Sequence, residues 1–230
     1  MLEMRIVKTI LDYPPAQNSL QKSLVFTTLL FVCTSVFWRL DKTTQQYFYG
    51  MSHEVFGNRE YWRLFTATLI HKDLGHYASN AMAILALGYL LFGWFSWRVY
   101  PLYCFLLSGL VNLFALKTYE PEVRLLGASG MVYLMAGFWL MSYIFIQRSK
   151  TVGRRLIRAV GVTLGTLFPT TFEPEVSYRT HAIGFVVGMI FGCIWFYFNR
   201  ERVRGFEILM PVEPEDVDVL GATSPRIDGH

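Results

Sequence analysis

Six long apolar segments, separated by charged or polar stretches, divide the chain. Each is close to the roughly 20 residues that an α-helix needs to cross a bilayer. The predicted spans are about Leu20–Trp38, Gly75–Phe95, Val99–Leu116, Ser129–Gln147, Leu156–Phe172 and Thr180–Phe198. The fifth is the weakest, because the charge-free stretch after Arg158 is short, so that its arginines must snorkel or the bilayer must thin. The pattern predicts an all-α membrane protein, a bundle of six transmembrane helices.

The segments outside these spans differ in character. Residues 1–18 are polar to weakly amphipathic and too short to form a domain. Residues 39–74 form a long connection rich in aromatic side chains, a composition that suits the lipid headgroup region. Residues 200–230 become acidic, contain proline and are predicted to be disordered. We therefore expect a short N-terminal segment (1–18), a membrane domain (19–199) and a C-terminal tail (200–230).

The composition supports a membrane protein and excludes other classes. Hydrophobic residues make up 53% of the chain and charged residues only 17%, against the quarter that is usual in soluble domains. The net charge of +4 does not indicate nucleic-acid binding, because the basic residues gather at the ends of the apolar segments. The three cysteines lie in three different spans without metal or redox spacing, which predicts small buried hydrophobes.

The distribution of lysine and arginine predicts the orientation. With six spans, both termini face the same side, and that side holds 13 of the 21 basic residues, many of them in the connection 148–158. Because basic residues favour the cytoplasmic side, both termini are predicted to be cytoplasmic. Ser129, His76 and His181 then all lie near the opposite, outer face.

A serine between two glycines begins the fourth span. Gly127 allows a loop to come close to Ser129, and Gly130 allows another helix to do so. The first backbone N–H groups of a helix have no partner within it and can donate to an oxyanion beside the serine. Taken alone, the motif also fits a packing patch of small residues, the commoner use of such a motif in membrane proteins.

Few ionisable side chains lie inside the spans, and two histidines, an asparagine and Ser129 lie at similar depth by residue count. His181 lies just inside the sixth span, and His76 and Asn80, four residues apart, share a face of the second. With Ser129 they could supply a base, oxyanion donors and a nucleophile for acyl transfer. Each alone could be a packing residue. A metal site is disfavoured, because His71 and His76 are five residues apart and the spans contain no carboxylate.

The sequence resembles the rhomboid family of intramembrane serine proteases over about residues 39–198. The resemblance rests on four motifs in the expected order: Tyr61–Thr66 (YWRLFT), His71…His76…Asn80, Gly127–Gly130 (GASG) with Tyr133, and His181–Gly188 (HAIGFVVG). It implies a six-helix rhomboid-type bundle with a long interfacial first loop. Each motif alone is weak, whereas the four together are specific.

The resemblance also implies roles for individual residues. Ser129 would be the nucleophile and His181 the general base of a dyad without an acidic third member. His76, Asn80 and the Ser129 N–H would form the oxyanion hole, and Tyr133 would pack against the His181 ring.

Other matched residues would have supporting roles. Trp62 and Arg63 belong to the structural motif of the first loop, which His71 would order. Thr180 departs from the family, whose members usually have alanine or glycine there, and its bulk bears on how closely the fourth and sixth helices pack. Close packing of these helices is predicted at Gly127, Gly130, Gly184 and Gly188.

The implied function is an intramembrane serine endopeptidase that cleaves transmembrane segments of substrate proteins through an acyl-enzyme, without a cofactor or metal. The implied setting is the bacterial inner membrane, with the bilayer and transmembrane substrates as partners and no nucleic acid. Two alternatives share the scaffold: a rhombosortase-like enzyme that trims C-terminal sorting segments, and a non-catalytic protein that binds membrane helices. The intact serine and histidine argue against the second of these. An unrelated small transporter or channel would have no use for the serine motif and would normally show repeated helices.

Overall fold

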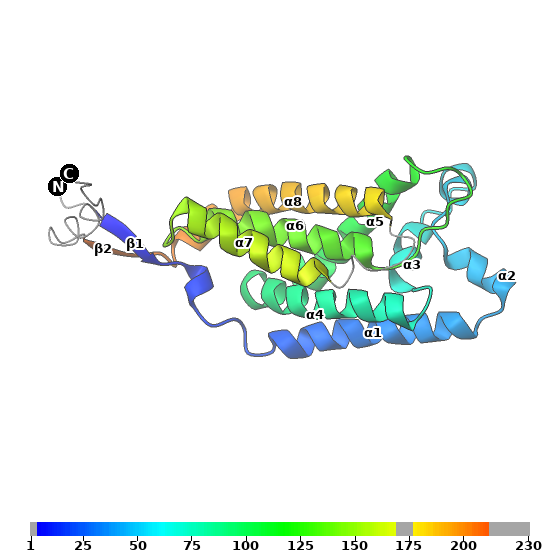
Figure 1. Cartoon of the computed structure of the whole chain (residues 1–230), viewed down its shortest axis with the longest axis horizontal. Coiled ribbons are helices and arrows are strands. Elements are labelled where there is room, and N and C mark those ends of the chain that lie inside the picture. Colours follow the sequence, from blue (N-terminus) through cyan, green and yellow to red (C-terminus); the bar gives the residue numbers. More distant parts are fainter. Residues whose placement is uncertain (1–3, 169–176, 212–230) are drawn as a thin grey trace, which may run out of the picture.

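The computed structural model describes residues 4–168 and 177–211. Its helices run side by side along the long axis of the molecule, with a two-stranded ribbon at one end and the short helices of the first loop at the other (Figure 1). The long helices are α1 (Ser19–Arg39), α4 (Leu74–Phe95), α5 (Cys104–Leu116), α6 (Ser129–Ile146), α7 (Val152–Leu167) and α8 (Tyr178–Arg204). A π-helical turn, η4 (Arg98–Tyr103), leads into α5.

Five of the helical segments in the described part of the chain are long and apolar enough to cross a membrane. They are α1, α4, η4 with α5, α6 and α8. The chain is therefore an integral membrane protein with an all-α bundle, as the hydrophobic pattern predicted. The predicted fifth span corresponds to α7, which has 16 residues and carries arginines in its first half. The end of that predicted span, residues 169–172, lies outside the described residues.

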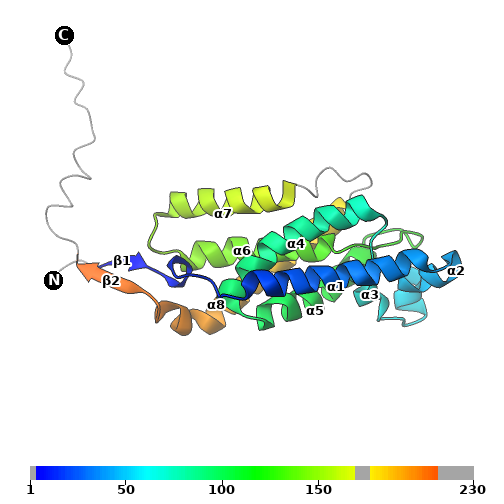
Figure 2. The same cartoon turned by 90° about the horizontal axis from the view of Figure 1, so that it is seen from below.

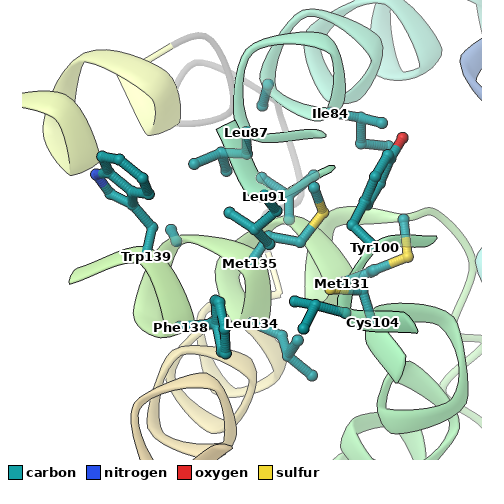
Figure 3. Packing of buried hydrophobic residues seen from close by; sticks show 14 of the residues in the cluster. Ile84, Leu87, Leu91, Tyr100, Cys104, Met131, Leu134, Met135, Phe138 and Trp139 are labelled. Carbon is teal, nitrogen blue, oxygen red and sulfur yellow. The ribbon is translucent and has the colours of Figure 1, made fainter. Parts of the chain in front are cut away.

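Helix α6 lies at the centre of the bundle. In Figure 1 it lies between α8 above and α4 below, and Figure 2 shows α7 along a further side of it. Its side chains interdigitate with those of α4 and α5 in the main hydrophobic core (Figure 3). There Leu87 and Leu91 of α4 meet Met131 and Met135 of α6. The central position of α6 means that its first residue, Ser129, is held by packing on several sides.

The contact between α6 and α8 brings the two backbones together. A Cβ atom added to Gly188 would overlap the Leu134 carbonyl oxygen, and one added to Gly137 would overlap the Phe185 carbonyl oxygen. A Cβ atom on Gly192 would lie 3.0 Å from the Met141 Cβ atom. Small residues permit this approach in a membrane, where the attraction between helices comes from close packing. Glycines therefore set the spacing between these two helices.

The first loop is folded rather than structureless. It contains α2 (Lys42–Gln45), η2 (Gln46–Phe48), the π-helical turn η3 (His53–Gly57) and α3 (Arg63–Leu69). Arg63 is buried at its centre, where its guanidinium pairs with Glu60 and donates to the carbonyls of Gln46 and Tyr49. Because one buried guanidinium donates to backbone carbonyls of more than one turn, the loop has a defined shape. Its polar and aromatic composition did not reveal that shape.

The two ends of the described chain pair with each other, contrary to the predicted separate tail. Helix α8 continues to Arg204, and β2 (Ile208–Pro211) pairs antiparallel with β1 (Met4–Lys8). The prediction of a disordered tail from residue 200 is therefore wrong up to residue 211, and the rest of that tail lies outside the described residues. The backbone hydrogen bonds of β1 are supplied by a segment about 200 residues away, which no local pattern reveals.

A buried polar contact anchors this ribbon to the end of α6. The Gln147 amide donates to Asp12 (2.8 Å) and its oxygen accepts from the Thr9 hydroxyl. Burial alone would raise the pKa of Asp12, but the hydrogen bonds from Gln147 and Thr9 outweigh it and lower the pKa below its ordinary value.

Candidate active site

Ser129 is the first residue of α6 and is half-buried. The chain reaches it through Gly127, whose φ of +108° lies in the region that favours glycine. No side chain in the described part of the chain caps this helix start. The first N–H groups of α6 therefore have no partner within the helix and lie around the serine. Backbone donors are therefore available beside the Ser129 hydroxyl.

The loop that leads to Ser129 is fixed by backbone hydrogen bonds to the first loop. Gly50 and Leu125 exchange two hydrogen bonds of 3.0 and 2.8 Å. The Gly127 N–H donates to the Ala67 carbonyl at 2.8 Å. These contacts connect α3 and the first loop directly to the start of α6, so the folded first loop helps to position Ser129.

His71 anchors the residue next to the serine. The Ala128 N–H donates to Nε2 of His71 at 3.2 Å. Nε2 therefore carries no hydrogen, so Nδ1 donates to the Thr34 hydroxyl at 3.0 Å, and this hydroxyl donates to the Leu69 carbonyl at 3.2 Å. Burial, with a smaller contribution from His76, lowers the pKa of His71 to about 3. His71 is thus neutral at physiological pH, which this network of hydrogen bonds requires.

His76 and Asn80 lie on one face of α4 beside the loop. Asp73 begins that helix by accepting a hydrogen bond from the His76 N–H at 2.8 Å. The His76 ring contacts Gly127 so closely that a Cβ atom on Gly127 would lie 2.6 Å from Cε1 of the ring. One hydrogen of the buried Asn80 amide is donated to the His76 carbonyl at 2.8 Å, and its Oδ1 has no hydrogen-bond partner among the described residues. Because the amide nitrogen carries two hydrogens, the second one is available for another acceptor.

His181 lies in the first turn of α8, only 7% exposed, and its ring stacks on that of Tyr133. The two ring centroids are 4.0 Å apart and the planes differ by 13°. Beside this stack, a Cβ atom on Gly184 would overlap the Gly130 carbonyl oxygen, so α8 rests directly on the residue after Ser129. The His181 ring is thus held next to the start of α6 by packing.

The structure brings the following predicted residues together around the start of α6: Ser129, His181, Tyr133, His76, Asn80, His71, Gly127, Gly130 and Gly184. Gly188 contacts the Leu134 carbonyl farther along α6. No hydrogen bond joins the Ser129 hydroxyl to the His181 ring within the described residues. The described residues include no group of three His, Cys, Asp or Glu side chains suited to a metal.

Two of the predicted supporting residues lie away from this centre. Arg63 organises the first loop, as described above, and its neighbour Trp62 is 53% exposed. Thr180 is buried beside Gly130 without separating the helices, because its methyl group fits against that glycine. The bulk of Thr180 is therefore accommodated in the contact between α6 and α8.

Three groups of the site carry no sequence signal. They are the Thr34 hydroxyl, the Ala67 carbonyl and the hydroxyl of Tyr119, which contacts Ser177 before α8. A threonine within an apolar span is common, and a backbone carbonyl has no identity in the sequence. Only the folded chain shows that they contact the residues around Ser129.

A comparison with protein-family profiles supports the same interpretation. The profile of the Rhomboid domain matches residues 58–198, more than half of the chain and all of the site residues named above from Trp62 to Gly188. A search of individual curated proteins gives no match.

Proposed function

Because the chain belongs to the rhomboid family, we propose that it is an intramembrane serine protease that cleaves transmembrane segments through an acyl-enzyme on Ser129. The observation that carries this proposal is the contact of Gly184 with the Gly130 carbonyl. It holds the helix that bears His181 against the helix that begins with Ser129. A metal or cofactor has no part in the proposed reaction.

In the proposed acylation step, the Ser129 oxygen attacks the carbonyl carbon of the scissile peptide bond. His181 accepts the hydroxyl proton as the attack proceeds and passes it to the amine nitrogen as the peptide C–N bond breaks, which leaves the acyl group on Ser129. Because no carboxylate is assigned to orient it, His181 is oriented by its stack on Tyr133. The ring therefore has a fixed direction without an acidic third residue.

The negative charge that develops on the carbonyl oxygen needs donors. The first N–H groups of α6, the His76 ring and the second hydrogen of the Asn80 amide are the proposed donors. Such preorganised donors act strongly in a site that is shielded from bulk water. In the second half of the reaction, a water molecule attacks the acyl carbon while His181 takes one of its protons. The bond between that carbon and the Ser129 oxygen then breaks, His181 gives the proton to the Ser129 oxygen, and the second product leaves as a carboxylic acid.

The substrate class follows from the position of the site in a membrane protein. The backbone of an intact transmembrane helix is protected by its own hydrogen bonds, so the scissile region must unwind before Ser129 can attack. We therefore propose substrates whose membrane segment contains helix-destabilising residues near the cleavage site. The setting that the family resemblance implies is a bacterial inner membrane. The bias of basic residues then predicts that both termini face the cytoplasm and that the site opens to the outer face.

A serine-directed fluorophosphonate probe and a transmembrane reporter test the proposal together. Purified wild-type protein should be labelled and should cut the reporter, whereas Ser129→Ala and His181→Ala should do neither. His53→Ala is the matched control, because His53 is exposed and its side chain pairs with the neighbouring Glu54. Because serine and histidine would act as one unit, the double variant should be no worse than either single one. Cleavage by Ser129→Ala at the wild-type rate would refute the assignment.

A further inference from the structure

Three hydroxyl groups form a closed ring where α8 begins. The Ser177 hydroxyl donates to Oγ1 of Thr180 at 2.5 Å, and the Thr180 hydroxyl lies 3.4 Å from the Tyr119 oxygen, to which it donates. The Tyr119 hydroxyl in turn contacts the Ser177 oxygen. With the Tyr119 hydroxyl as donor in that last contact, each group donates once and accepts once, so all three are satisfied by one another. We call these three residues the hydroxyl ring.

The hydroxyl ring joins two segments that lead to the proposed dyad. Tyr119 lies in the connection between α5 and α6, which continues to Ser129, whereas Ser177 and Thr180 lie at the start of α8, directly before His181. Arg179 strengthens the connection, because its guanidinium donates to the Thr118 carbonyl and lies 5.4 Å from the Tyr119 ring centroid. The hydroxyl ring therefore directly links the connection that leads to Ser129 with the helix that carries His181.

Thr180 has two distinct contacts. Its methyl group faces Gly130, where an added Cβ atom would lie 3.1 Å from it, and its hydroxyl group belongs to the ring. The side chain is 5% exposed, so water does not readily replace a lost partner. The backbone is held at the same point, because the His181 N–H donates to the Ser177 carbonyl at 3.0 Å. Thr180 thus connects the hydroxyl ring with Gly130 and with its neighbour in the chain, His181.

We infer that the Thr180 hydroxyl, held by Tyr119 and Ser177, is a positioning group that sets the direction of the His181 ring toward Ser129. The inference rests on the proposed serine protease function. Tyr133 supports one face of the His181 ring, which fixes its plane, whereas the hydroxyl ring fixes the helical turn from which the side chain projects. A small displacement of a base from its nucleophile lowers the rate of reaction far more than the affinity for substrate.

Two substitutions at Thr180 separate its contacts. Thr180→Val keeps the methyl group and removes the hydroxyl, whereas Thr180→Ser keeps the hydroxyl and removes the methyl group. With purified protein and a transmembrane reporter, we expect Thr180→Val to lower kcat about tenfold with little change in KM, and Thr180→Ser to stay within about threefold of wild type. Fluorophosphonate labelling of Ser129 should slow in parallel, because the probe needs the activated serine but no helical substrate.

Tyr119→Phe is the second test, because it removes a different hydroxyl of the same ring at a half-buried position. It should lower kcat in the same way, and the double variant with Thr180→Val should be no slower than the slower single variant. It also serves as the test if Thr180→Val does not fold, as judged by its thermal midpoint in detergent.

The possible failures are distinguishable. Wild-type kcat in both Thr180→Val and Tyr119→Phe would overturn the inference and leave the proposed protease function standing. Equal loss in Thr180→Ser, which keeps the hydroxyl group, and in Thr180→Val, which removes it, would also overturn the inference, since the loss would then not depend on the hydroxyl group. A wild-type protein that neither reacts with the probe nor cuts the reporter would refute the proposed function itself.

Discussion

The ring of Tyr133 stacks on that of His181, with centroids 4.0 Å apart and planes 13° from parallel. Tyr133 is one helical turn after Ser129 on α6, and His181 is on α8, so the stack crosses the contact between these helices. It is a contact of flat rings rather than an ion pair. Its function would therefore be to orient the imidazole without supplying a charge.

Substitutions at Tyr133 test that role. Tyr133→Phe keeps the flat ring and should retain kcat within about threefold, whereas Tyr133→Ala removes the stack and should lower kcat about tenfold or more, because the imidazole loses its support. Kinetics with a transmembrane reporter measure both variants, and thermal midpoints in detergent check their folding. If Tyr133→Ala kept the same kcat as Tyr133→Phe, the contact between the two rings would have no part in the reaction.

The proposed oxyanion donors should be sensitive to removal. His76→Ala and Asn80→Ala should each lower kcat by about 10²–10³, the loss typical of one oxyanion donor. Ser79→Ala is the matched control, because the hydroxyl of Ser79, like the amide of Asn80, donates to the His76 carbonyl, at 3.1 Å. Full activity in Asn80→Ala, or an equal loss in Ser79→Ala, would remove Asn80 from the oxyanion hole.

The contact between α6 and α8 should not tolerate a single methyl group. Gly188→Ala would place its Cβ atom onto the Leu134 carbonyl, so the helices must separate, at a cost of about 1–3 kcal/mol or more. Gly161→Ala on α7 is the control, because nothing lies within 4 Å of the added atom. We expect a lower thermal midpoint and lower activity only in Gly188→Ala. Equal midpoints in the two variants would contradict the close backbone contact.

His71 should make the stability of the protein depend on pH. Its pKa of about 3 in the folded protein lies below its ordinary value of 6.5, so between these values the unfolded chain binds a proton that the folded chain does not. The contribution of the neutral His71 to the free energy of unfolding is therefore fully present above pH 6.5. It decreases as the pH falls toward 3, by at most about 1.4 kcal/mol per pH unit. Thermal midpoints at pH 7 and pH 5 should differ less in His71→Gln than in wild type. His53→Gln, at an exposed position, should keep the wild-type difference, and an unchanged difference in His71→Gln would contradict the burial of a neutral His71.

The predicted orientation can be measured with single cysteines. Glu120→Cys and Gly153→Cys lie in connections on opposite sides of the membrane by the six-span prediction, and the native Cys33 and Cys193 are replaced by alanine in both. A membrane-impermeant maleimide added to intact cells should label Glu120→Cys and leave Gly153→Cys unlabelled until the cells are opened. The opposite result would reverse the orientation and place the site on the cytoplasmic side.

The sequence by itself determined where the helices lie, because hydrophobicity along a membrane span is a local property. The predicted spans Leu20–Trp38 and Ser129–Gln147 agree within one residue with α1 and α6. The least accurate start is that of α7, predicted at Leu156 and observed at Val152, because its first turns carry arginines that interrupt the apolar pattern. The family was also evident from the sequence, since its motifs are short and each lies within one segment.

Only the tertiary structure decided how the site is supported. The hydrogen bonds of His71 to Thr34 and Ala128 join three segments, and the hydroxyl ring joins Tyr119 to Thr180. From the sequence, Thr180 could be noted as an unusual residue, but neither its partner nor its effect could be inferred. Hydroxyl and backbone groups have no periodicity, and a hydrogen bond depends on the distance between two atoms that the chain brings together only when it folds. The pairing of β1 with β2 escaped prediction for the same physical reason.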